Sequence, residues 1–230
     1  MKLAIMQPYF LPYIGYFQLI KAVDKFVFYD DVNYINRGWI NRNRILLNKE
    51  AHYITVHQKE ASQNKLINEI EIIDNRSKIK KTIINAYRRA PYFDSAWSII
   101  EDILDYKTSK ISELAAYSVT KICDYLGVKT QFEFSSKSYT QTRNLKLEKR
   151  LIAICEANKA LEYINPIGGI SLYKKEIFME AGINLYFIKP NLVTYDQFEN
   201  SFVENLSIVD LMMFNNSNDM ALLLDEYELI

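Results

Sequence analysis

Side chains suited to an anionic ligand are concentrated in one short stretch of the chain. The stretch contains Arg37, Trp39, Asn41, Arg42 and Arg44. A guanidinium group binds a phosphate through two parallel hydrogen bonds, and an indole face stacks on a base or a sugar ring. A nucleotide-linked sugar has both features, so we predict that these residues bind such a substrate. Solvated arginines on a hairpin explain each residue taken singly equally well.

A stiff aromatic loop that follows the first apolar run is the second candidate site. Its sequence is Gln7-Pro8-Tyr9-Phe10-Leu11-Pro12-Tyr13-Ile14-Gly15-Tyr16-Phe17. Each proline fixes φ, and a tyrosine hydroxyl can hydrogen-bond a phosphate or a sugar. We therefore predict that Gln7, Tyr9 and Tyr16 contact a ligand. The alternative is that the rings only pack around a tight turn.

Two adjacent carboxylates, Asp30 and Asp31, follow the second apolar run. Paired carboxylates bind a divalent metal, orient sugar hydroxyls or supply a general base. Neighbouring residues at the end of a strand point to opposite sides, so we expect only one of the two to face the site. We assign this position to Asp31. The alternative is an ordinary loop or capping acid.

A glycine pair, Gly168-Gly169, lies between a predicted strand and a predicted helix. Free backbone amides at such a turn can cradle a phosphate. We include both glycines among the predicted binding residues, and a plain turn is the alternative.

The histidines and cysteines do not predict a metal site. His52 and His57 lie in one predicted strand at a spacing that places them on opposite faces. Cys123 and Cys155 each lie within a helical pattern and are predicted to be core thiols. No combination of these residues with acids has the spacing of a zinc site.

Apolar runs alternate with helical patterns over most of the chain, which predicts an α/β fold with a mostly parallel, Rossmann-like sheet. The predicted strands cover residues 2–6, 26–29, 68–73, 129–134, 162–164 and 184–188. The predicted helices cover residues 15–23, 77–88, 92–106, 108–126, 145–158, 173–181, 207–214 and 218–228.

Two features interrupt this alternation. Residues 41–47 and 51–57 alternate around Asn48-Lys49-Glu50, which predicts a β-hairpin. Residues 74–127 contain only helical patterns and form a predicted helical insert within a single domain, residues 1–230. We expect the insert to be either a wall over the site or the surface of a homodimer.

Composition limits the class of partner. The chain has 230 residues, 49% of them hydrophobic, with 28 basic and 28 acidic side chains. The formal charge of zero argues against a general nucleic-acid-binding protein, which would have a basic excess. No stretch approaches the ~18 uninterrupted apolar residues of a membrane-spanning helix. Met1-Lys2 leads directly into an apolar run without a signal-peptide pattern, so we expect a cytoplasmic location.

Several of these motifs together resemble the signature of the WbqC-like family. The resemblance covers the aromatic loop, Asp30-Asp31-Val32, Trp39-Ile40-Asn41-Arg42-Asn43-Arg44, Arg89-Ala90-Pro91-Tyr92-Phe93, the segment 163–173, Tyr195-Asp196-Gln197-Phe198 and Leu206-Ser207-Ile208-Val209-Asp210-Leu211. Members that resemble this chain are encoded with genes for bacterial O-antigen and related surface polysaccharides. The resemblance implies a role in making or modifying sugars.

The aromatic loop also resembles, in its layout, the site of HIGH-type nucleotidylyltransferases. In those enzymes His-x-Gly-His follows the first strand, and its histidines meet the ATP phosphates. The corresponding residues here are Tyr13-Ile14-Gly15-Tyr16, with a tyrosine in place of each histidine. The resemblance implies that Tyr13, Gly15 and Tyr16 line a nucleotide pocket. ATP and Mg²⁺ are therefore the candidate cofactors, although the missing histidines count against ATP.

The preferred hypothesis is acyl or aminoacyl transfer onto the amine of a nucleotide-linked amino sugar. Some HIGH-type enzymes, pantothenate synthetase among them, join an amine to an acid through an acyl-adenylate. Asp31 would orient or deprotonate the attacking amine, and Tyr16 is the second predicted catalytic residue. One alternative is a non-catalytic protein that binds a nucleotide sugar or assembles with a sugar-modifying enzyme. A glycosyltransferase ranks last, because Asp30-Asp31 lacks the spacing of an Asp-x-Asp motif.

Overall fold

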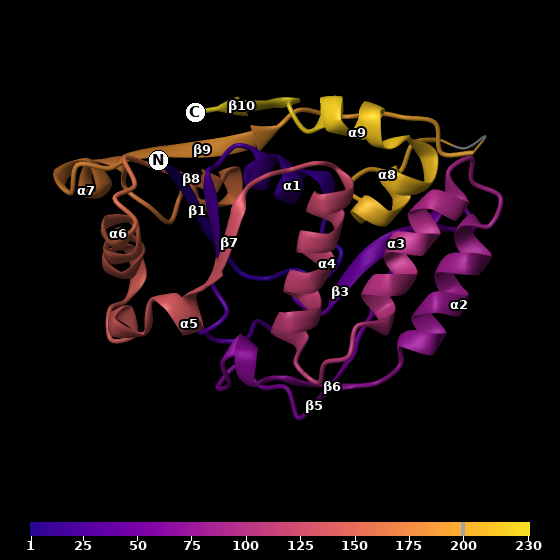
Figure 1. Ribbon diagram of the computed structural model, residues 1–230, viewed down its shortest axis with the longest axis horizontal. Helices are drawn as coiled ribbons and strands as arrows, with labels where there is room; N and C mark the ends of the chain where they lie inside the picture. Colours follow the sequence, from indigo (N-terminus) through magenta and orange to yellow (C-terminus); the bar gives the residue numbers. More distant parts are fainter. Residues whose placement is uncertain (199–200) are drawn as a thin grey trace.

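A six-stranded sheet forms the centre of the molecule in the computed structural model, which describes residues 1–198 and 201–230 (Figure 1). The strand order is β10-β9-β8-β1-β2-β7, and every pair is parallel except β10 with β9. The strands are β1 Lys2–Met6, β2 Lys25–Phe28, β7 Gln131–Phe134, β8 Glu162–Pro166, β9 Asn184–Pro190 and β10 Tyr227–Leu229. The predicted α/β class with a mostly parallel, Rossmann-like sheet is confirmed.

Each face of the sheet is covered by helices, as a parallel sheet requires. Ala4 and Phe26 face one cluster of buried apolar residues, together with α1 Ile14–Lys21. Leu3 and Val27 face a second cluster, together with α6 Leu147–Ala157 and α7 Lys175–Glu180. Strand β1 therefore has apolar residues on both faces, which explains why its sequence is a continuous apolar run.

The strand order changes direction at β1. From β1 the chain passes through α1 to β2 on one side, whereas β8 pairs with β1 on the other side. Open α/β sheets bind ligands beyond the carboxyl ends of their strands at such a switch point. The segment that follows β1 is therefore well placed for a binding site.

The predicted hairpin is confirmed as β3 Arg42–Leu47 paired with β4 Glu50–Thr55. Its turn residues Asn48 and Lys49 have φ of 51° and 70°, the positive values that a tight two-residue hairpin turn needs. The predicted strand at 68–73 is shorter than expected. A 3₁₀ turn at Ile67–Glu69 precedes β6 Glu71–Ile73, which pairs with β5 His57–Lys59.

Three helices fill the region predicted to be helical, and Figure 1 shows them on the opposite side of the sheet from α6 and α7. They are α2 Arg76–Tyr87, α3 Phe93–Asp105 and α4 Ile111–Tyr125. Gly127, the residue after the predicted helix 108–126, has φ of +70°, the left-handed conformation that commonly ends a helix. Thr108, the first residue of the predicted helix 108–126, does not cap α4, because α4 begins after Lys110. That 74–127 is an insert, and that it forms a homodimer surface, stay predictions.

The carboxyl-terminal part of the chain differs most from the prediction. The remaining helical segments are α5 Ser135–Ser138, 3₁₀ turns at Thr140–Thr142 and Ile167–Gly169, α8 Ile208–Phe214 and α9 Ser217–Leu223. The predicted helix at 218–228 is wrong beyond Leu223, because the tail pairs as β10 with the free edge of β9. The helix predicted to begin at residue 145, directly after Asn144, begins instead after Lys146, so Asn144 does not cap α6. None of the described helices combines the length and apolar character needed to cross a membrane.

Candidate functional site

A cavity of about 360 Å³ lies where three distant segments of the chain meet. We call it the aromatic cavity. Its lining comes from the loop after β1, from the start of the β3–β4 hairpin and from the segment before α8. The lining residues are Tyr9, Pro12, Tyr13, Trp39, Asn43, Arg44 and Asn205. Four of the predicted binding residues, Tyr9, Tyr13, Trp39 and Arg44, are therefore brought together.

The loop after β1 is held against the hairpin by backbone and side-chain hydrogen bonds. The amide of Phe10 donates to the carbonyl oxygen of Trp39 at 3.2 Å. The side-chain nitrogen of Asn43 donates to the carbonyl oxygen of Phe10 at 3.3 Å. Phe10 is fully buried, so these bonds form in the interior and fix the positions of the aromatic side chains around the cavity.

Ser207 links the third segment to both of the others. Its hydroxyl donates to the carbonyl oxygen of Leu11 at 2.7 Å, and its amide donates to the carbonyl oxygen of Arg44 at 2.7 Å. The same hydroxyl accepts from the amide of Val209 and so caps α8. The amide of Ile208 donates to the carbonyl oxygen of Pro12 at 2.8 Å. The three walls of the cavity are therefore connected by direct hydrogen bonds.

Gly15 determines where the ring of Tyr13 lies. A Cβ atom at residue 15 would lie 2.4 Å from a ring carbon of Tyr13, which is closer than two atoms can approach. The tyrosine ring packs directly on the glycine backbone, so a side chain at residue 15 would displace the ring. Gly15 therefore does not line the cavity and instead positions Tyr13, which does.

Trp39 and Arg44 are part of a ladder of stacked rings and guanidinium groups on the hairpin. The rings of Trp39 and Tyr53 stack with their centroids 6.3 Å apart. The guanidinium carbon of Arg44 lies 5.8 Å from the Trp39 ring centroid, and that of Arg42 lies 4.6 Å from the Tyr53 ring centroid. Trp39 is 37% exposed and Tyr53 is 46% exposed, so large aromatic faces remain in contact with solvent.

The charge of Arg44 is not neutralised within the part of the chain that the structure describes. One terminal nitrogen donates to the carbonyl oxygen of Asn205 at 2.9 Å, and the buried Nε has no partner there. The arginines that do form ion pairs with described carboxylates are Arg76, Arg143 and Arg150. A guanidinium that has no carboxylate partner among the described residues and lies beside an exposed indole is the arrangement expected for an anionic ring-bearing ligand.

The other predicted residues of the hairpin region lie outside the cavity lining. Arg42 donates to the carbonyl oxygens of Gly38 and Arg37. Asn41 is buried, where it accepts from the hydroxyl of Tyr34 and donates to the carbonyl oxygen of Val56. Arg37 is exposed. Their predicted contacts with a ligand stay predictions.

Tyr16 is buried below the cavity. It is 3% exposed, its hydroxyl donates to the carbonyl oxygen of Gln7 at 2.8 Å, and its ring centroid lies 5.5 Å from that of Tyr9. Burial raises its pKa well above 10. These contacts position Gln7 and Tyr9. Its predicted catalytic role and the predicted ligand contact of Gln7 stay predictions.

The tyrosines that line the cavity are neutral near pH 7. Burial, reinforced by the neighbouring Tyr13, raises the pKa of Tyr9 to about 12. Burial also raises the pKa of Tyr13. Both hydroxyls can therefore donate as well as accept hydrogen bonds, which suits contact with sugar hydroxyls and phosphate oxygens.

The carboxylates of Asp30 and Asp31 lie in a closed polar cluster at the ends of β2 and β7. Ser135 donates to both carboxylates, and Ser136 donates to Asp30 through its amide at 3.0 Å and its hydroxyl at 2.7 Å. The expectation that the two side chains point to opposite sides is therefore wrong. The strand has ended at Phe28, so the alternation of a strand no longer applies.

Asp31 is neutralised by two arginines. Its Oδ2 lies 2.7 Å from a terminal nitrogen of Arg150 and 3.2 Å from Nε of Arg143. Burial alone would raise the pKa of Asp31, but the hydrogen bonds from Ser135 and Arg150 outweigh it, so the pKa falls below its usual 3.8. A carboxylate with a lowered pKa is a weak proton acceptor, and its predicted catalytic role stays a prediction.

The Asp30–Asp31 cluster does not fit a magnesium site. Mg²⁺ needs free carboxylate oxygens in octahedral geometry, whereas both carboxylates here already accept hydrogen bonds from serine or arginine groups. Among the described residues, no group of three or more His, Cys, Asp or Glu side chains could hold a metal ion.

Gly168 and Gly169 lie in the 3₁₀ turn after β8 and do not line the aromatic cavity. A Cβ atom at residue 169 would lie 2.2 Å from the side-chain oxygen of Asn165, whereas the position at residue 168 is open. The second glycine is therefore explained by packing of Asn165. The predicted phosphate contact of both glycines stays a prediction.

The family of the chain follows from its sequence similarity. The profile of the WbqC-like protein family matches residues 7–222. The chain belongs to the WbqC-like protein family. It is 31% identical over 217 residues to the uncharacterized protein Rv1507c of Mycobacterium tuberculosis (strain ATCC 25618 / H37Rv), and the match covers 92% of each protein. No solved structure was found to match. The matched range of this WbqC-like protein contains every segment that lines the aromatic cavity.

The sequence prediction missed three polar residues of this WbqC-like protein. Asn43 and Asn205 line the aromatic cavity, and Ser207 links its walls. The sequence signal for two of them is the family motif that begins at Leu206, because it contains Ser207 and directly follows Asn205. Only the folded chain shows that Ser207 contacts residues far away in the sequence.

In this WbqC-like protein the prediction for the cysteines is confirmed, whereas the prediction for the histidines is not. The single strand predicted to hold both histidines is wrong, because His52 lies in β4 and His57 begins β5, and both line a separate cavity of about 240 Å³. Both cysteines are free and buried, as predicted. Burial raises the pKa of Cys155 to about 12, so this thiol is not a nucleophile near pH 7.

Proposed function

We propose that this WbqC-like protein binds a nucleotide-linked amino sugar in the aromatic cavity and forms an amide on the sugar amine by acyl or aminoacyl transfer. The observation that carries the proposal is that Trp39 and Arg44 line the same cavity as Tyr9 and Tyr13. The cavity volume of about 360 Å³ lies in the lower part of the range for small-molecule sites, about 300–1,000 Å³.

Four of the lining residues, and Arg42 next to them, have roles that their environments support. Trp39 presents an exposed indole for stacking on a base or sugar ring, and Arg44 supplies, for a phosphate, a guanidinium that has no ion-pair partner among the described residues. The neutral hydroxyls of Tyr9 and Tyr13 hydrogen-bond the sugar. Arg42 lies over Tyr53 on the same ladder and extends the positive surface towards a second phosphate.

The proposed reaction forms one carbon–nitrogen bond. The amine nitrogen of the sugar attacks the carbonyl carbon of an activated acyl donor, the activating group leaves with the bonding electron pair, and the nitrogen loses a proton. With ATP as the activating reagent, the carboxylate first displaces pyrophosphate, and AMP then leaves as the amide forms. In this scheme Mg²⁺ accompanies the ATP phosphates, because Asp30 and Asp31 do not offer a protein site for it.

The second candidate is a non-catalytic protein that binds the nucleotide sugar for a partner enzyme. One specific observation favours it. Both predicted catalytic groups are engaged inside the protein, Asp31 with two arginines and Tyr16 with the carbonyl oxygen of Gln7. A binding partner needs the aromatic cavity but does not need either group.

An activity assay separates these two functions. The protein is incubated with ATP, Mg²⁺, a panel of carboxylic and amino acids and a UDP- or dTDP-linked 4-amino sugar, and mass spectrometry detects the amide and the released pyrophosphate. We expect amide formation that Trp39→Ala reduces by about tenfold or more, since one stacking contact contributes ~1–3 kcal/mol. Arg88→Ala, an exposed arginine outside the cavity, is the control. Binding of the sugar without any product would instead support the non-catalytic partner.

A further inference from the structure

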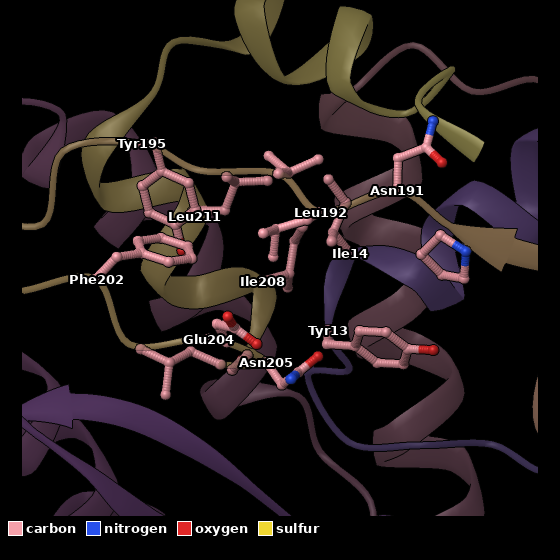
Figure 2. Close-up of a pocket in the computed structure, with 14 residues that line it drawn as sticks. Tyr13, Ile14, Asn191, Leu192, Tyr195, Phe202, Glu204, Asn205, Ile208 and Leu211 are labelled. Atoms are coloured by element: carbon pink, nitrogen blue, oxygen red, sulfur yellow. The ribbon is translucent and has the colours of Figure 1, made fainter.

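A second cavity of about 200 Å³ adjoins the aromatic cavity and shares Tyr13 and Asn205 with it. We call it the apolar chamber. Its walls come from the start of α1, from the segment after β9 and from the segment that leads into α8. Figure 2 shows these side chains surrounding a common space, with Tyr13 and Asn205 on one side of it. Nothing in the proposed nucleotide-sugar site accounts for this second space.

Most of the chamber wall is apolar. Ile208 is fully buried and Leu211 is 2% exposed, so they form a fixed floor. Leu192 is 71% exposed, although Figure 2 shows its side chain directed towards Ile208. Tyr195 and Phe202 form an edge-to-face pair with centroids 5.2 Å apart. Ile208, Leu211 and Leu192 together give the chamber an apolar surface that an apolar side chain of a ligand could contact.

Glu204 is an exposed residue and the one carboxylate among the described residues of this wall, and Figure 2 shows it directed towards the space below Ile208. Glu204 takes part in no ion pair or side-chain hydrogen bond between the described residues. Asp210, another acid near the chamber, differs because it accepts hydrogen bonds from Tyr87 and Tyr195. An unpaired carboxylate beside apolar side chains suits a ligand that carries a positive charge on an apolar body.

We infer that the apolar chamber binds an aminoacyl donor with an apolar side chain, with the donor's α-ammonium group at Glu204. The inference rests on the proposed amide-forming function and names the class of its donor. A cavity of about 200 Å³ is slightly larger than the ~150 Å³ cavity that holds a benzene molecule, so it fits a side chain of the size of leucine or phenylalanine.

The charges of the two cavities support this arrangement. Arg44 lines only the aromatic cavity and attracts the phosphates of the acceptor, whereas Glu204 lines only the apolar chamber and attracts the ammonium of the donor. Arg44 repels the ammonium group of the donor from the aromatic cavity, and Glu204 repels the phosphates of the acceptor from the apolar chamber. The shared residues Tyr13 and Asn205 lie between them, where the acyl carbon of the donor would meet the amine of the sugar.

Calorimetric titration with two matched probes tests the inference. L-leucinamide carries the α-ammonium and an apolar side chain, and 4-methylpentanamide has the same carbon skeleton without the amine. We expect the protein to bind L-leucinamide at least tenfold more tightly than 4-methylpentanamide. Glu204→Gln should remove that preference, and Glu204→Asp should restore part of it. Glu180→Gln, an exposed glutamate on α7, is the control.

The outcomes separate the inference from the proposed function, because a UDP-linked amino sugar is titrated into the same variants. Loss of leucinamide binding in Glu204→Gln with unchanged binding of the nucleotide sugar supports the chamber assignment. No binding of leucinamide by the unmodified protein, or equal binding by Glu204→Gln, overturns it. Glutamate-dependent binding of leucinamide without any binding of nucleotide sugars supports the chamber assignment and overturns the proposed function.

Discussion

The aromatic cavity and the Asp30–Asp31 cluster both follow adjacent parallel strands, yet they differ in whether their charges are free. Nε of Arg44, beside an exposed tryptophan, has no hydrogen-bond partner within residues 1–198 and 201–230. Asp31 is enclosed by Arg143, Arg150 and Ser135. The sequence predicts a functional role for both Arg44 and Asp31, and the neighbours that the fold gives each residue distinguish them. A charged residue is available to a ligand only where the protein itself does not neutralise it.

The largest expected effect comes from breaking the closed cluster. Arg150→Met leaves the buried carboxylate of Asp31 without its closest cation and should destabilise the protein by ~3–5 kcal/mol. Arg143 is half-exposed, so Arg143→Met should cost about 1 kcal/mol or less. Urea unfolding monitored by circular dichroism measures both. Equal losses for the two variants would show that Asp31 is not neutralised mainly by Arg150.

A smaller effect is expected from the serine that links the walls of the aromatic cavity. Ser207→Ala removes the hydroxyl that bonds the carbonyl oxygen of Leu11 and caps α8, at a cost of about 1–2 kcal/mol. It should also weaken nucleotide-sugar binding, because the three walls lose a shared contact. Ser217→Ala, in the first turn of α9, is the control for a serine with no such role. Unchanged stability and affinity in Ser207→Ala would contradict the linking role.

The smallest expected effect is a pH dependence of the closed cluster. The pKa of Asp31 is lowered in the folded protein, so its contribution to stability is complete above the ordinary value of 3.8 and is lost as the pH falls through the folded value. The free energy of unfolding should therefore fall on acidification below about pH 4. Asp31→Asn should make that fall less steep. Parallel curves for the two proteins, measured by urea unfolding at several pH values, would contradict the assignment.

The elements near the amino terminus are largely predictable from the sequence because their signals are local. A continuous apolar run predicts β1, and alternation around Asn48-Lys49 predicts the hairpin. Trp39 and Arg44 were predicted as binding residues from their chemistry alone, and the structure places them in one cavity. Whether they contact a ligand is still to be measured.

The features that the sequence did not reveal depend on contacts between distant residues. Arg150 lies 119 residues from Asp31 and neutralises it, and Ser207 lies 196 residues from Leu11 and bonds it. The tail forms β10 because the edge of β9 is free to pair, which no pattern within residues 218–228 indicates. Periodicity within a segment therefore predicts the elements but not the partners of their polar side chains.

The most direct test of the account compares one arginine from each region. A UDP-linked 4-amino sugar is titrated calorimetrically into the unmodified protein, Arg44→Ala and Arg143→Ala. The account predicts that Arg44→Ala loses about tenfold in affinity, ~1.4 kcal/mol, whereas Arg143→Ala stays within about twofold. Unchanged affinity in Arg44→Ala together with a loss in Arg143→Ala would place the ligand at the Asp30–Asp31 cluster and contradict the assignment of the aromatic cavity.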